Sequence, residues 1–276
     1  MKKYLIIFLV VNILFISSCN ANNIVVDKTY EIKYHRPLHS TNEIDVESSK
    51  FEYMQKDWKR LKKVKEGKPP NRGILDNFYY EDDWIIWLEE DKIMVSENPI
   101  YNEFIFDVDD GYFISENMGE FGGTVDFFGN DGTNYTVLEC NPHFMFSIDD
   151  KIYLFEGSTH VHTRGSFYTL KKEKDKWEED RRYDLGGLPA SFAVYNGEIY
   201  VIVYKVPGID WTNAYHELLK ITIQEDDAEI QTLLSSNKIY HPNSMAIKDN
   251  MLYISLSGVI ETINLKNYQI RYYVKK

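Results

Sequence analysis

The sequence predicts an all-β fold, on three observations. Aromatic residues make up 15% of the 276 residues, and 21 of them are Tyr. β-branched residues are also frequent, and both kinds of side chain pack well on a pleated surface. Finally, a twelve-residue pattern recurs along the chain, and each copy has the features of a β-hairpin. Strands are therefore expected through most of the chain.

Each copy of the pattern begins at Pro or Asn, passes through an apolar strand and a turn, and ends in a second strand that closes on an aromatic residue. The four copies align without gaps at 102–113, 142–153, 189–200 and 242–253. Three of them carry proline in the same register, at Pro142, Pro189 and Pro242. The turns are Asp109-Asp110-Gly111, Asp149-Asp150, Asn196-Gly197 and Asp249-Asn250. Asp, Asn and Gly tolerate the positive backbone angles of tight hairpins, so each copy predicts a hairpin.

A second pair of strands fits between successive copies. These strands are expected at 125–128 and 135–138, 167–170 and 177–183, 218–223 and 230–234, and 259–265 and 269–274. Four strands per unit, repeating at roughly 40 to 50 residues, resemble the blades of β-propeller proteins. Residues 74–95 would supply a further blade, completed by a strand near 24–34 that closes the ring. We expect five four-stranded blades, with six allowed; the alternative is a twisted β-sandwich, which does not explain the proline register.

The N-terminus has the features of an export signal. Lys2 and Lys3 precede an apolar run over 4–16, which is shorter than the ~20 residues of a membrane-spanning helix. The run ends in Ile16-Ser17-Ser18-Cys19, which resembles the lipobox of bacterial lipoproteins. The resemblance implies that residues 1–18 are a signal peptide and that Cys19 carries acyl chains such as palmitate. An ordinary secretory signal, with Cys19 incidental, is the alternative.

Two segments separate the signal from the repeats. Residues 19–48 are expected to form a tether with one strand, and residues 49–66 a helix packed on the domain. In the second segment, apolar side chains recur at helical spacing, at Phe51, Met54, Trp58 and Leu61. Ser49 with Glu52 fits a capping box at its start, and Gly67 follows its end. The propeller domain is expected to span 70–276.

Charge and cysteine content exclude some functions. The formal net charge is −12, so the chain would be repelled by nucleic acid and by anionic lipid surfaces. If Cys19 is acylated, Cys140 remains without a partner, and an internal disulfide is impossible. We interpret Cys140 as a small core residue.

A histidine group is the candidate site. His143 and His241 lie beside repeated prolines, in the loops that enter the innermost strands of a propeller. His160 and His162 follow the second hairpin, where alternation would point both rings the same way, and Arg164 is close in sequence. Such a cluster at the channel mouth could bind a metal or an anionic group, or act as acid and base. Alternatively, these are separate surface histidines that never converge.

Two functions follow. The first is a noncatalytic binding or scaffold module of the cell envelope, held to the membrane by its lipid, whose propeller binds a protein, a glycan or another exported ligand. The second is an envelope hydrolase or lyase that uses the histidines with a divalent metal. We favour binding without a cofactor, because the sequence carries no nucleophile elbow, no phosphate loop and no complete zinc motif.

Overall fold

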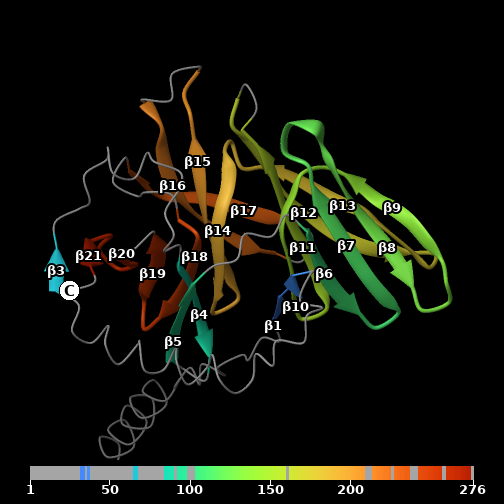
Figure 1. The fold of residues 1–276 in the computed structure, drawn as a ribbon, viewed down its shortest axis with the longest axis horizontal. Coiled ribbons are helices and arrows are strands. Elements are labelled where there is room, and N and C mark those ends of the chain that lie inside the picture. Colours follow the sequence, from blue (N-terminus) through green and yellow to red (C-terminus); the bar gives the residue numbers. More distant parts are fainter. Residues whose placement is uncertain are drawn as a thin grey trace, which may run out of the picture.

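The computed structural model describes residues 32–34, 36–37, 65–67, 84–89, 92–97, 103–159, 162–208, 213–224, 227–236, 242–256 and 259–274. These residues form an all-β structure of antiparallel sheets (Figure 1). They also include one short 3-10 turn between strands, η1 (Gly119–Phe121). The predicted all-β class is therefore confirmed.

Four sheets each contain a meander of four consecutive antiparallel strands. The first holds β6 (Glu103–Val108), β7 (Gly111–Asn117), β8 (Gly123–Gly129) and β9 (Asn134–Glu139). The second holds β10 (Pro142–Ile148), β11 (Lys151–Ser158), β12 (Arg164–Glu173) and β13 (Lys176–Asp184). The third holds β14 (Leu188–Tyr195), β15 (Glu198–Lys205), β16 (Tyr215–Ile223) and β17 (Ala228–Ser236). The fourth holds β18 (Ser244–Lys248), β19 (Met251–Leu256), β20 (Val259–Asn264) and β21 (Ile270–Val274).

The repeated windows are confirmed as hairpins. In three of them both turn residues have positive φ: Asp149 and Asp150, Asn196 and Gly197, and Asp249 and Asn250. This is the backbone of the two-residue turns whose twist matches that of the flanking strands, which explains the recurrence of Asp, Asn and Gly. The second strand pairs were also predicted in the correct places.

The repeated proline marks a bulge in two sheets. In β10 the pairing passes from Pro142 to Phe144, and in β14 from Pro189 to Ser191, so that His143 and Ala190 are left over. Proline lacks an N–H donor and is tolerated at the start of a strand or at a bulge. The proline register therefore records a repeated local structure.

Short strands from the N-terminal part of the chain extend three of the sheets. β1 (Ile32–Tyr34) pairs with β10, β2 (Arg36–Pro37) pairs with β6, and β3 (Lys65–Gly67) pairs with β21. β4 (Trp84–Glu89) and β5 (Lys92–Glu97) form a separate hairpin that packs beside β18 and β19. That hairpin was predicted, but the strand expected to complete it instead adds to β10 through Ile32–Tyr34.

Two further predictions concern the chain before residue 70. The helix predicted over 49–66 lies outside the described residues except for Lys65 and Glu66, which belong to β3. The open edge of β21 offers backbone partners to this segment, and such tertiary pairing overrides local helix propensity. Because β1, β2 and β3 are built into the sheets, the sheet domain also takes in residues that precede 70.

The meander sheets stack face to face in chain order, and an apolar core fills each interface. Phe113 and Phe127 meet Met145 and Leu154 between the first and second sheets. Equivalent clusters join the second to the third and the third to the fourth. This series of four sheets differs from a two-sheet sandwich.

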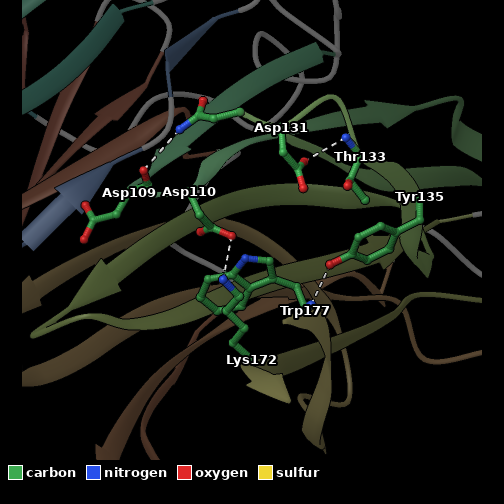
Figure 2. Close-up of polar contacts among 8 residues, drawn as sticks. Asp109, Asp110, Asp131, Thr133, Tyr135, Lys172 and Trp177 are labelled. Carbon is green, nitrogen blue, oxygen red and sulfur yellow. Dashed lines mark hydrogen bonds and ion pairs between the residues drawn. The ribbon is translucent and has the colours of Figure 1, made fainter. Parts of the chain in front are cut away.

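Each meander has two ends. We call one of them the entry end: the first and third strands of each meander begin there, and the second and fourth strands finish there. The opposite end is the turn end, where a hairpin joins the first strand to the second. At the turn end of the first two sheets, Lys172 Nζ lies 2.8 Å from Asp110 Oδ2, and the Trp177 backbone N–H donates to Tyr135 Oη at 2.6 Å (Figure 2). These contacts fasten the second sheet to the first.

The fourth strand of each meander forms an outer edge whose row of backbone groups is either interrupted by a bulge or covered by another strand. A register shift interrupts the pairing of β9, β13 and β17 with their inner neighbours and leaves over Val137, Asp180 and Leu233. The pairing of β20 with β21 continues without a shift, and β21 is covered by β3. Every meander therefore has an outer edge that is either bulged or covered.

Candidate functional site

Three of the predicted site residues lie at the entry end of the second sheet. His143 is the bulge residue of β10, His162 lies in the loop between β11 and β12, and Arg164 is the first residue of β12. His160 and His241 lie outside the described residues. The topology therefore brings His143, His162 and Arg164 to one end of one sheet, although no hydrogen bond or ion pair joins them.

His143 is half-buried and held in one state. Its Nε2 lies 3.2 Å from the carbonyl oxygen of Gly157, and a carbonyl only accepts, so Nε2–H donates. Burial lowers the pKa of the imidazole, and the hydrogen bond to Gly157 opposes that shift. The neutral ring therefore leaves Nδ1 as an acceptor.

His162 and Arg164 are exposed. Arg164 lies opposite Ser158 in the β11–β12 register, and the next pair is Gly157 with Gly165. A Cβ on Gly165 would lie 2.3 Å from the carbonyl oxygen of Gly187, so this glycine lets the link between the second and third sheets pass close to β12. Close backbone packing at Gly165 thus fixes the start of β12, next to which the exposed side chains of His162 and Arg164 lie.

A buried or largely buried carboxylate occurs in each interface between meander sheets. Glu156 shares the strand face of Ile152 and Leu154, which pack on the first sheet. Its carboxylate lies 3.5 Å from Arg182 Nη2, and Arg182 Nε donates to Ser166 Oγ at 3.0 Å. Arg182 also lies over the Tyr168 ring, 5.3 Å from its centroid. The Arg182 guanidinium therefore contacts three groups: the Glu156 carboxylate, the Ser166 hydroxyl and the Tyr168 ring.

The second carboxylate belongs to Glu217, between the second and third sheets. Its Oε2 lies 2.7 Å from Lys205 Nζ, and Ser235 Oγ donates to Oε1 at 3.2 Å. Both members of the pair are largely buried, with 21% of the Lys205 and 14% of the Glu217 side chain exposed. The ion pair between Lys205 and Glu217 lies at the entry end of this interface.

The third is Glu261, which is fully buried. It lies on the strand face of Ile263, and His216 lies on that of Leu218; these two apolar residues belong to the core between the third and fourth sheets. His216 is also buried, and its ring centroid lies 5.0 Å from that of Tyr204. A carboxylate and an imidazole therefore enter the same interface from facing sheets.

Sequence reasoning missed these three glutamates. The available signal was strand alternation, because Glu156, Glu217 and Glu261 each share a face with apolar residues at i±2. A charged residue at a strand position that faces the core predicts a buried ion pair or hydrogen bond, because an unpaired buried charge is costly.

Cys140 lies near Glu156 in the link from β9 to β10. Burial, with a smaller contribution from the Glu156 charge, raises the pKa of its thiol to about 12. At neutral pH it is a protonated thiol, and the nucleophilic form of cysteine is the thiolate. Cys140 was interpreted as a small core residue; in the structure it is partly buried and packs against the core between the first and second sheets.

The loop from β7 to β8 supplies an exposed apolar tip at the entry end. Phe121 is 81% exposed and Met118 is 45% exposed. Backbone hydrogen bonds close the loop between Met118 and Gly122, and Asn117 Nδ2 donates to the carbonyl oxygen of Pro142 at 3.0 Å. The tip is thus held by the fold and faces solvent.

Comparisons with known proteins give no relative. No protein-family model matches the chain, and no curated protein matches it. Within the part of the chain that the structure describes, no group of three or more His, Cys, Asp or Glu side chains is placed to bind one metal ion. Among the same residues, no helix has the length and apolar character needed to cross a membrane.

Proposed function

We propose that the chain is a bacterial lipoprotein, anchored in the cell envelope through acylated Cys19, and that its sheets are blades of a β-propeller. The propeller acts as a noncatalytic binding module for a protein, a glycan or another exported ligand. Four-stranded meanders that stack in chain order through apolar faces support the propeller, since propeller blades pack in this manner.

The observation that carries binding over catalysis is the state of the reactive groups at the entry end. Cys140 is a protonated thiol, and His143 donates its Nε2–H to a carbonyl group. Glu156 and Glu217 are paired with Arg182 and Lys205. Meanwhile exposed side chains of differing chemistry, Phe121, His162 and Arg164, project from a rigid base. Rigid scaffolds that present varied exposed side chains are typical of binding sites.

The anchor is tested by metabolic labelling. Cells that express the full chain are given a radioactive or alkyne-tagged fatty acid, and Cys19→Ala is the matched variant. We expect label and membrane fractionation with the natural sequence, and loss of both with Cys19→Ala. Label that persists in Cys19→Ala would refute acylation at this residue.

Ligand binding is tested by photocrosslinking in growing cells. A photoreactive phenylalanine analogue is placed at Phe121 or His162, and at Tyr112, an exposed aromatic residue of the turn end, as control. We expect a discrete adduct from the entry-end positions, none from Tyr112, and no change with chelator. Stoichiometric bound metal that is lost on substitution of His143 or His162, with chelator-sensitive turnover, would refute a noncatalytic module.

A further inference from the structure

The direction in which the chain enters the sheets bears on how the anchored protein is oriented. β1 is antiparallel to β10, with Ile32 opposite Ile148 and Tyr34 opposite Phe146. β10 runs from the entry end to the Asp149-Asp150 turn, so β1 runs from the turn end towards the entry end. The chain therefore joins the fold beside the Asp149-Asp150 turn.

The next strand follows the same course. In β2, Arg36 lies opposite Ile105 and Pro37 opposite Phe104, while β6 runs away from the entry end towards its own turn. β2 therefore also runs towards the entry end. Two pairings, to two different sheets, give the same chain direction.

The length of the preceding segment limits how the body can turn. Twelve residues separate Cys19 from Ile32. Any twelve-residue segment reaches at most ~40 Å when fully extended, and an unstructured chain of that length has a mean span of about 20 Å. β12 has ten residues, so the sheet measures about 30 Å from turn end to entry end. The mean span of such a chain is shorter than the body, and a reversed body would need about three quarters of the extended length.

We propose that the anchored protein holds its turn end towards the bilayer and its entry end away from it, open to a partner outside the membrane. This orientation rests on the proposed acylation of Cys19. The tether imposes it, since the turn end is polar and of mixed charge: it carries acidic residues such as Asp109, Asp110 and Asp131 together with lysines such as Lys151, Lys172 and Lys176. Figure 2 shows the three aspartates at the turn end of the first two sheets.

The test measures the distance of each end from a bilayer. The full chain is acylated in a bacterial host, purified in detergent and reconstituted into phosphatidylcholine vesicles that contain an acceptor-labelled lipid. A donor dye is attached to a single new cysteine in a Cys140→Ala background, at Lys176→Cys on the turn end or at His162→Cys on the entry end. Both sites belong to the second sheet. We expect the Lys176 dye to lie nearer the bilayer by about 20 Å or more.

A lengthened tether is the matched control. Twelve Gly and Ser residues inserted after Asn23 raise the mean span of the segment to about 28 Å, close to the length of the body. We expect the difference between the two dyes to fall by at least half. An unchanged difference would overturn the tether as the cause of the orientation.

The remaining outcomes separate the two proposals. Equal distances, or a His162 dye nearer the bilayer than the Lys176 dye, would overturn the orientation while leaving the anchor intact. Protein that does not co-sediment with the vesicles would overturn the anchor and, with it, the orientation.

Discussion

Replacement of Arg182 by Met should destabilise the fold although more than half of the arginine side chain is exposed. Glu156 would then keep its carboxylate in the interface between the first and second sheets, where 7% of its side chain is exposed, without a cation. At 3.5 Å and an effective dielectric constant of 20, the attraction that is lost is about 5 kcal/mol. The exposure of Arg182 and the cost of desolvation offset about half of this. We expect the free energy of unfolding to fall by about 2–3 kcal/mol.

Urea denaturation followed by tryptophan fluorescence measures this change, with Arg181→Met as the matched control. Arg181 is the preceding residue of β13, is exposed and forms no close ion pair with a described residue, although its charge helps to lower the pKa of Asp227. Its replacement should therefore cost less than ~0.5 kcal/mol. Because the penalty arises from the unpaired carboxylate, adding Glu156→Gln to Arg182→Met should restore most of the lost stability. Equal effects of the two arginine variants, or no rescue by Glu156→Gln, would refute the reasoning.

Four further predictions concern other parts of the entry end. The Cys140 thiol should react with iodoacetamide at pH 8 at least tenfold more slowly in the folded chain than in urea, and a similar rate in both would contradict its pKa of about 12. Because that pKa is raised above the ordinary 9.0, its contribution to stability is complete below pH 9 and is lost as the pH rises towards 12, which denaturation at pH 8 and pH 10.5 would detect. Gly165→Ala should lower the free energy of unfolding by about 1–3 kcal/mol, since its Cβ meets the Gly187 carbonyl group, and an unchanged urea midpoint would show that the link can move aside. Phe121→Ser should leave the melting temperature within a degree or two but abolish the adduct formed from position 162; a full adduct would exclude the loop from the binding face.

The fold followed from the sequence wherever local chemistry decided the structure. Turn residues such as Asn196-Gly197 favour positive φ, and the strands beside them alternate, so hairpins and strand order could be predicted. The partners of 32–34 and 65–67 could not, because a three-residue strand gains its hydrogen bonds from whichever distant edge is open. For the same reason, the pairing of Lys65 and Glu66, at the end of the predicted 49–66 helix, with β21 could not be predicted.

The candidate site was predictable only in part. The register of Pro142 placed His143 at the entry end, and sequence proximity added His162 and Arg164. The link between Glu156 and Arg182 could not be predicted, because it joins side chains 26 residues apart across two strand pairings, one with a bulge. The environment of Cys140 likewise depends on packing between two sheets.

The bulges in the outer strands and the cover over β21 have a consequence for the proposed membrane-anchored protein. Lipid attachment concentrates molecules in two dimensions, where open strand edges on neighbours would meet often and join into extended sheets. The extra residues in β9, β13 and β17, together with the cover that β3 lays over β21, interrupt the row of backbone groups that such joining requires. On the proposed anchoring, crowded copies can then lie side by side as separate molecules, each with its entry end unobstructed.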